Sequence, residues 1–319
     1  MEASVVSPVR VAIVGTGHVG ATFAYALLLS GLAAEIVLIN RDAADAEGEA
    51  MDLAHATPLV RPARVWAGGY ADCAGAAVVV ITAGATQGEH DSRLDLAEQN
   101  GAIFRSIVPQ IARYTTTAVL VVATNPVDVL TYATIQLSGL PPGRVIGSGT
   151  ILDTSRLQSL LGERLGVDPR SVHADVIGEH GDNQVPVWSL ATVGGAPVRD
   201  AARSLGVPFD AGTERELAKA TREAAHRVVD RKGATYYAVA TGLMRIVEAI
   251  VRDQRTVLTV STLADHEPGD DGICFSMPAM IGAQGVHRIV QLPLDADERH
   301  ALRRSTDTLR KATSAYDRR

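Results

Sequence analysis

The first half of the chain alternates short apolar runs with longer segments of helical period. The apolar runs are almost continuous in Val, Ile and other small aliphatic residues. They lie at residues 9–15, 35–40, 64–69, 77–84, 118–126 and 144–149. Strands covered by helices on both faces have this pattern, because neither face of such a strand meets water. The first half is therefore predicted to form an α/β fold with a doubly wound, parallel sheet.

The pattern changes after about residue 150 and predicts a second, mixed α+β domain. Its expected elements are a helix at 151–166, β-rich stretches at 173–181 and 184–195, helices within 213–253, a strand at 255–263 and an amphipathic helix at 295–316. A chain of 319 residues exceeds the size at which one core keeps growing. We expect two domains, 1–150 and 151–319, that meet at a packed junction, because no flexible linker or repeat separates them.

Composition and charge exclude several classes of partner. The chain is 46% hydrophobic and 21% charged, which is ordinary for a soluble globular enzyme. Its net charge is −6, and no block of Lys and Arg is long enough to follow a phosphate backbone. We therefore expect no nucleic-acid partner.

The termini, apolar runs and cysteines indicate a cytoplasmic protein without a metal site. The N-terminus lacks a basic stretch followed by an apolar one, and no apolar run reaches membrane-spanning length. Cys73 and Cys274 are far apart and form no C-x-x-C or Cys/His cluster. We interpret both as packing residues in a reduced compartment.

A glycine-rich loop follows the first predicted strand and precedes a helical segment. Gly15, Gly17 and Gly20 have the spacing G-x-G-x-x-G. A turn without side chains lets a pyrophosphate approach the backbone, and the N-terminus of the next helix attracts its negative charge. Placed between a strand and a helix, the motif predicts a Rossmann dinucleotide-binding domain.

The end of the second predicted strand departs from the usual NAD marker. An acid is expected there to bind the adenosine ribose, but this chain has Asn40 followed by Arg41. An amide bonds a hydroxyl without repelling a 2′-phosphate, and Arg41 could pair with one. The cofactor is expected to be NAD, with NADP tolerated; the alternative is that Arg41 is only a solvated charge.

Four polar residues have the chemistry of carbonyl reduction. His180 could donate a proton, a carboxylate such as Asp153 could orient it, and Arg156 or Arg93 could bind negative charge. Asp153 and Arg156 are three residues apart, which places them on one helix face. Arg93 lies in a polar segment that could close as a lid. Taken singly, Asp153 could instead be a helix cap and His180 a turn residue. Arg93 and Arg156 could be surface charges.

Motifs along nearly the whole chain resemble the L-lactate dehydrogenases of the lactate/malate dehydrogenase family. They are "GTGHVG", "EGEAMDLAHA", "ITAGATQ", "SRLDLAEQN", "VATNPVDVLTYAT", "RVIGSGTILDTSRL", "IGEHGD", "VPVWS", "KGATYYAVA" and "VLTVST". The resemblance implies an NAD-dependent oxidoreductase of glycolysis and pyruvate fermentation that interconverts pyruvate and L-lactate. A malate or broader 2-hydroxyacid dehydrogenase, or a non-catalytic dinucleotide-binding protein, are the alternatives.

The resemblance also implies a role for each polar residue. His180 is the acid/base and Asp153 fixes its tautomer, while Glu179 and Asp182 are read as local structure. Arg156 binds the substrate carboxylate with two hydrogen bonds, and Arg93 polarises the C2 carbonyl. Further matches are Asn125 and Thr235 at the substrate and nicotinamide, and Val19, Gly84, Ala85 and Ser106 at the cofactor or substrate. For Thr235 the alternative is a hydroxyl inside a helix, bonded to its own backbone.

Gln87 resembles the family position that distinguishes substrates. A glutamine there accommodates the methyl group of pyruvate, whereas malate dehydrogenases carry an arginine that pairs with the second carboxylate of oxaloacetate. Gln87 therefore favours lactate over malate. The next residues, 88–91, depart from the commoner family pattern, which leaves open how the loop closes and whether bulkier 2-keto acids are accepted.

Two further positions bear on regulation and assembly. Many bacterial relatives are tetramers activated by fructose 1,6-bisphosphate, which binds an arginine and a histidine across a subunit interface. His173 matches the histidine, but Gln158 stands at the arginine position, so we expect this activation to be weak, absent or replaced by another trigger. The family implies a homotetramer, and a dimer stays open.

Overall fold

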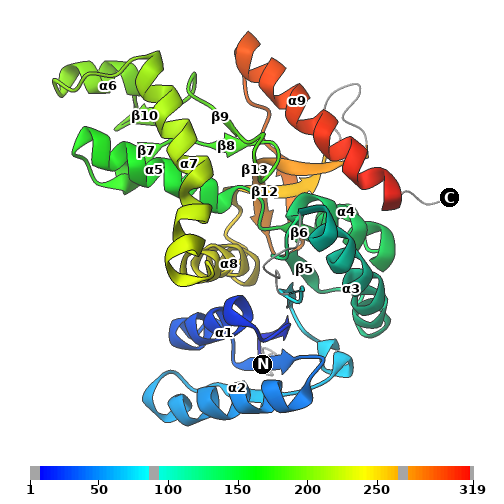
Figure 1. Cartoon of the computed structure of the whole chain (residues 1–319). Helices are drawn as coiled ribbons and strands as arrows, with labels where there is room; N and C mark the ends of the chain where they lie inside the picture. Colours follow the sequence, from blue (N-terminus) through cyan, green and yellow to red (C-terminus); the bar gives the residue numbers. More distant parts are fainter. Residues whose placement is uncertain (1–7, 86–92, 265–271, 317–319) are drawn as a thin grey trace, which may run out of the picture.

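The computed structural model describes residues 8–85, 93–264 and 272–316. Its centre is one nine-stranded sheet with the strand order β14-β13-β12-β6-β5-β4-β1-β2-β3. Helices cover both faces of this sheet, and a second group of helices and short strands lies beside it (Figure 1). Among the described helices, none is long and apolar enough to cross a membrane.

The six parallel strands coincide with the six apolar runs of the first half. They are β1 (Arg10–Val14), β2 (Glu35–Ile39), β3 (Arg64–Ala67), β4 (Val78–Ile81), β5 (Val119–Val122) and β6 (Val145–Gly147). Chain order reverses at β1, which pairs with β2 on one side and with β4 on the other. The predicted doubly wound parallel sheet is confirmed.

Alternate residues of these strands face two separate cores. Val11 and Ile13 of β1 belong to one core and Ala12 and Val14 to the other, so the strand is buried on both faces. The first core is closed by α1 (His18–Ser30), α2 (Ala43–Ala56) and α8 (Tyr237–Val251), and the second by α3 (Arg93–Tyr114) and α4 (Val127–Ser138). This double burial is why the strands are continuous apolar runs.

Three antiparallel strands extend the sheet beyond β6. They are β12 (Thr256–Leu263), β13 (Cys274–Gly282) and β14 (Gly285–Ile289). β12 joins β6 through the pair Ser261–Gly147, so strands from both halves of the chain form one sheet. Strand signals in the sequence predict β12 but neither β13 nor β14. Pro278 lies inside β13, and a proline argues against a central strand in sequence-based reasoning.

The remaining elements are those of the mixed second half, together with short 3₁₀ turns in both halves. The helices are α5 (Ile151–Leu165), α6 (Val198–Ser204), α7 (Ala211–Lys232) and α9 (Ala296–Thr313). Two-residue strands lie at β7 (Val172–His173), β8 (Val176–Ile177), β9 (Val185–Pro186), β10 (Thr192–Val193) and β11 (Ala196–Pro197). Short 3₁₀ turns lie at Thr57–Leu59, Tyr70–Cys73, Pro142–Arg144, Pro169–Ser171 and Ser314–Tyr316. The predicted α5, β12 and closing α9 are confirmed, and the helical stretch at 213–253 is split at Gly233 into α7 and α8.

Both cysteines are fully buried and free. Cys73 and Cys274 belong to the core beneath α3 and α4. Burial raises the pKa of the Cys73 thiol to about 12 and raises that of Cys274 well above its usual value. The uncharged thiols are thus packing groups in the structure.

Candidate active site

In the glycine loop, Gly15 and Gly20 are tightly packed, whereas Gly17 faces open space. Gly15 has φ +104°, and a Cβ there would lie 2.4 Å from the backbone nitrogen of Ala83. A Cβ on Gly20 would lie 1.9 Å from the carbonyl oxygen of Gly15, whereas a Cβ on Gly17 would meet nothing within 4 Å. The free space at Gly17, directly before the N-terminus of α1, suits a pyrophosphate. The residues present therefore fit a dinucleotide.

Asn40 at the end of β2 is held by its neighbours. Its Nδ2 donates to Thr16 Oγ1 at 2.8 Å, and its Oδ1 accepts from the backbone N–H of Arg41 at 2.8 Å. Arg41 is exposed beside it. The structure thus places an uncharged side chain and a cation where a ribose-binding acid is usual.

Asn100 of α3 ties together two other predicted cofactor segments. Its Oδ1 accepts from the backbone N–H of Ala85 at 2.6 Å, and its Nδ2 donates to the carbonyl oxygen of Asn125 at 2.7 Å. Gly84 packs against the same side chain, since a Cβ there would lie 3.2 Å from Asn100 Oδ1. Asn100 is 2% exposed and therefore fixes the ends of β4 and β5. The sequence analysis did not identify this residue, which stands in the quoted motif "SRLDLAEQN".

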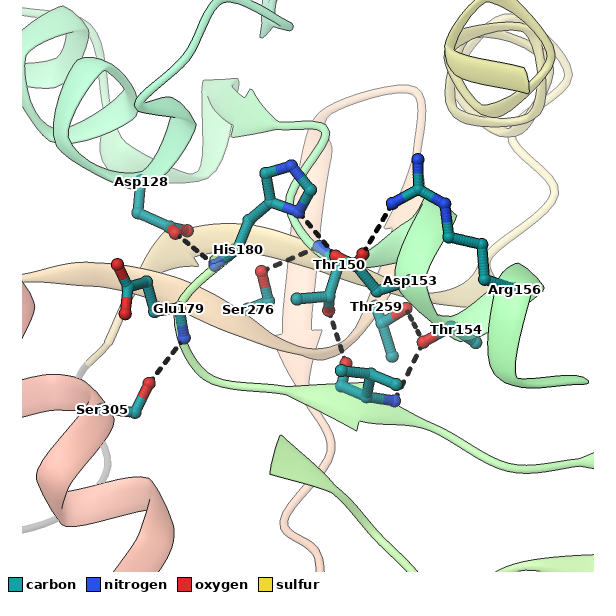
Figure 2. A network of polar contacts seen from close by, with 11 residues as sticks. Asp128, Thr150, Asp153, Thr154, Arg156, Glu179, His180, Thr259, Ser276 and Ser305 are labelled. Atoms are coloured by element: carbon teal, nitrogen blue, oxygen red, sulfur yellow. Dashed lines mark hydrogen bonds and ion pairs between the residues drawn. The ribbon is translucent and has the colours of Figure 1, made fainter. Parts of the chain in front are cut away.

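His180, Asp153 and Arg156 form one cluster (Figure 2). His180 Nδ1 lies 2.5 Å from Asp153 Oδ2, and Arg156 donates from a guanidinium nitrogen to Asp153 Oδ1 at 2.9 Å. Asp153 is buried, and the side chain of Arg156 is 15% exposed. The two oxygens of the Asp153 carboxylate contact His180 and Arg156. Asp153 is therefore not a helix cap, and Arg156 is not a solvated surface charge. The N-cap of α5 is instead Thr150.

The start of α5 is fixed to the sheet, which positions Asp153. The backbone N–H of Thr150 donates to Ser276 Oγ at 3.0 Å, and its hydroxyl donates to the carbonyl oxygen of Val176. Thr154 Oγ1 accepts from the backbone N–H of Val176 at 2.9 Å. These buried contacts join α5 to β8 and β13, so the helix presents Asp153 at a defined place (Figure 2).

The segment before His180 is held at Gly178, where a larger residue would be strained. Gly178 has φ +85° and exchanges two backbone hydrogen bonds of 2.9 Å with Ser276. A Cβ on Gly178 would lie 2.7 Å from Ser305 Oγ, which itself accepts from the backbone N–H of Glu179 at 2.7 Å. Glu179 accepts a hydrogen bond from Asn183, as expected for local structure. The loop therefore aims His180 at Asp153.

A second carboxylate, Asp128, supports His180 from the other side. Its Oδ2 accepts from the backbone N–H of His180 at 2.8 Å, and the residue is 2% exposed. Asp128 was not predicted from the sequence, because an acid in the first turn of a helix such as α4 is ordinary.

The electrostatics of the cluster favour a charged histidine. Burial acts to lower the pKa of His180, but the charge and hydrogen bond of Asp153, with the charge of Asp128, outweigh it and raise that pKa above its usual value. Burial raises the pKa of Asp128 to about 6, although the Ser261 hydroxyl and the backbone N–H of His180 act to lower it. Near neutral pH, Asp128 is ionised and His180 holds a proton more firmly than a free imidazole.

The other predicted residues lie in several places. Arg93 is the first residue of α3. The side chain of Arg93, Gln87 and the rest of the segment predicted to close as a lid lie outside the described residues. Thr235 lies between α7 and α8, so the helix-interior reading is wrong. Val19 lies in the first turn of α1, and Ser106 is exposed on α3, where its carbonyl accepts from Gln110.

Gln158 and His173 are brought close to each other. Gln158 Nε2 donates to the carbonyl oxygen of Ala174 at 3.3 Å, directly after His173. His173 is exposed on β7. The uncharged amide of Gln158 therefore lies at the position where activated relatives carry a phosphate-binding arginine.

Comparisons with known proteins match both halves of the chain. Residues 9–147 match the family model for the lactate/malate dehydrogenase NAD binding domain, and residues 150–317 that for the lactate/malate dehydrogenase alpha/beta C-terminal domain. An L-lactate dehydrogenase of Acetivibrio thermocellus is 45% identical over 308 residues, covering 97% of each chain. A probable L-lactate dehydrogenase of Schizosaccharomyces pombe is 49% identical over 95% of this chain and 92% of its own.

Solved structures agree with this match. The crystal structure of a minor L-lactate dehydrogenase from Enterococcus mundtii, in a ligands-bound form, superposes with a TM-score of 0.94 at 39% identity. The superposition covers 98% of this chain and 99% of that one. A lactate dehydrogenase from a deep-sea metagenome library superposes with a TM-score of 0.92 at 38% identity.

Proposed function

The chain belongs to the lactate/malate dehydrogenase family of NAD-dependent oxidoreductases, and from this premise we propose that it interconverts pyruvate and L-lactate. The observation that carries the proposal is the cluster of His180, Asp153 and Arg156. A proton donor, its orienting carboxylate and a carboxylate-binding cation meet there within hydrogen-bond distance. These are the groups that reduction of a 2-keto acid requires.

When bound, the cofactor would supply the hydride that reduces C2 of pyruvate. In the proposed reaction His180 donates the proton to the C2 oxygen. The proton leaves from Nε2, because Nδ1 faces Asp153. Asp153 stabilises the imidazolium before the transfer and keeps the neutral ring in the required tautomer afterwards. In the reverse direction His180 takes the proton of the lactate hydroxyl.

Arg156 and Arg93 are proposed to bind the substrate. The Arg156 guanidinium uses one nitrogen for Asp153, which leaves further N–H groups for the substrate carboxylate. Arg93 is proposed to polarise the C2 carbonyl, with Asn125 and Thr235 at the pocket. Glycines 15, 17 and 20, together with Val19, Asn40, Gly84, Ala85 and Ser106, are proposed to contact the cofactor.

Substrate choice is proposed to depend on Gln87. The test is steady-state oxidation of NADH with pyruvate or oxaloacetate, by the wild type and by Gln87→Arg. We expect the wild type to prefer pyruvate and the variant to shift towards oxaloacetate. A wild type that prefers oxaloacetate would overturn the proposed substrate, and an unchanged ratio in the variant would overturn the role of Gln87.

Assembly, regulation and location are proposed from the family and the surface. A homotetramer or a dimer is proposed from the family, and its contacts could include the exposed apolar side chains Tyr25, Leu29, Met51, Tyr237 and Val257, which are between 48% and 66% exposed. With Gln158 at the effector position, adding fructose 1,6-bisphosphate should lower the pyruvate KM only weakly or not at all; a several-fold fall would contradict this. We further propose that the chain divides into segments 1–150 and 151–319 and acts in cytoplasmic glycolysis.

A further inference from the structure

A groove of about 550 Å³ lies between α5 and α7, beside the catalytic cluster. Arg156 of α5 contributes to one wall. Arg227, Arg231 and Lys232 of α7 contribute three more cations. The apolar part of the lining comes from Leu160, Ala220, Ala224 and Val228. One arginine is therefore shared by the groove and by the site at His180.

The sign of charge in the groove is opposite to that of the chain as a whole. Among the described residues that line it, four are cationic and no carboxylate is present, whereas the net charge of the chain is −6. A cleft lined by one sign of charge raises the local concentration of the opposite ion and its association rate. The groove thus favours small anions.

Two of these cations are held in place by neighbouring groups. Arg231 donates to the carbonyl oxygen of Arg227 at 2.7 Å. Lys232 Nζ lies 3.4 Å from the ring centre of Tyr236 and 4.1 Å from that of Tyr237. Tyr236 in turn stacks on His18 of the glycine loop, at 5.2 Å between ring centres. Lys232 therefore sits where the groove, the predicted cofactor loop and the segment of Thr235 meet.

The position of these cations at the C-terminus of α7 explains only part of why they line the groove. Cations in the last turn of a helix stabilise its dipole, which accounts for Arg231 and Lys232. Arg227 lies one turn earlier, where this effect has faded, and its side chain is exposed. The helix dipole also does not explain why these three cations of α7 line the same groove as Arg156.

We propose that this groove collects the 2-keto carboxylate substrate and delivers it to Arg156. Arg227 and Arg231 attract the carboxylate electrostatically, and the apolar lining accepts the alkyl end of the keto acid. The proposal rests on the proposed function, because it takes Arg156 as the residue that finally binds the carboxylate. Arg227 and Arg231 act on the approach of the substrate and leave the chemical step unchanged.

The test is the dependence of kcat/KM for pyruvate on ionic strength, measured with saturating NADH. In Arg227→Gln/Arg231→Gln we expect kcat/KM to fall about fivefold at ~0.01 M salt, where charges act over about 30 Å. At ~1 M salt, where they act over about 3 Å, the difference from the wild type should shrink to less than about twofold. The kcat should stay unchanged at both salt concentrations.

Two further variants separate charge from structure. Arg303→Gln/Arg304→Gln removes the same charge from exposed positions of α9, which lies well away from α7 (Figure 1), and should match the wild type. Arg227→Lys/Arg231→Lys keeps the charge and should retain kcat/KM at low salt. A fall in the lysine variant, an equal fall in the α9 variant, or a loss that persists at high salt would overturn the proposal.

The two proposals fail in different ways. A wild type that does not turn over pyruvate would refute the proposed function and this inference together. A wild type that turns over pyruvate, with a salt dependence that the glutamine variant shares, would refute the role of the groove alone.

Discussion

His180 Nδ1 and Asp153 Oδ2 lie 2.5 Å apart, although 27 positions separate the two residues in the chain. Asp153 comes from the first turn of α5 and His180 from the loop after β8. Because both elements are anchored to Ser276 of β13, this distance is set by the sheet and not by either residue's local sequence. The pair is the structural basis of the proposed proton transfer.

Replacing Asp153 by Asn should slow catalysis and move its pH dependence. The variant loses the charge that raises the pKa of His180, and kcat/KM for pyruvate should fall about 10²- to 10⁴-fold. Pyruvate reduction needs protonated His180, so activity falls as pH rises through its pKa; a lower pKa moves this fall to lower pH. The pH profile of kcat/KM is the measurement.

A matched control is Asp168→Asn, which removes the carboxylate of an exposed ion pair with Arg170. It should leave the profile unchanged. If Asp153→Asn kept the wild-type pH profile, a group other than Asp153 would have to raise the pKa of the proton donor.

Asp128→Asn should give a smaller effect that depends on pH. The amide oxygen still accepts from the backbone N–H of His180, but the negative charge that supports the imidazolium is lost. We expect kcat/KM to fall about three- to tenfold above pH 7. Since the pKa of Asp128 is about 6, the wild-type carboxylate becomes neutral below that pH, and the two profiles should converge there. Profiles that differ by a constant factor at every pH would indicate a structural role only.

Arg156→Lys should weaken binding of the substrate carboxylate. A lysine keeps the charge but cannot form two parallel hydrogen bonds, and a lost charged hydrogen bond is worth about 1.5–3 kcal/mol. The kcat/KM for pyruvate should therefore fall about 10- to 100-fold, mainly through KM. Arg170→Lys, in an exposed ion pair, is the control. A variant with unchanged KM would show that another cation binds the carboxylate.

Asn40→Asp should sharpen the choice of cofactor. A carboxylate at the end of β2 repels a 2′-phosphate, and the ratio of kcat/KM for NADH over NADPH should rise about tenfold. Arg41→Gln should separately lower kcat/KM with NADPH and leave that with NADH unchanged. If the wild type already discriminates as strongly as Asn40→Asp, Asn40 does not relax the preference.

Much of this architecture could be predicted because its signals are local. The six parallel strands are continuous apolar runs, and Asp153 and Arg156 have a spacing that places them on one helix face. Asp128 could not be assigned in this way, because an acid in the first turn of a helix is ordinary; only its burial and its contact with His180 distinguish it. β13 escaped prediction because Pro278 lies inside it, and a proline argues against a central strand when only the sequence is considered.

The pairing of Gly147 with Ser261 limits how this chain can be divided. A fragment that ended after β6 would expose that strand's free N–H and C=O groups along one side, inviting association with other chains. It would also lack α8, which covers α1 and the same sheet face. Chimeras that exchange the cofactor half between relatives should therefore carry β12 and α8 from the same parent as β6. The pairing of β6 with β12 and the packing of α8 then remain native.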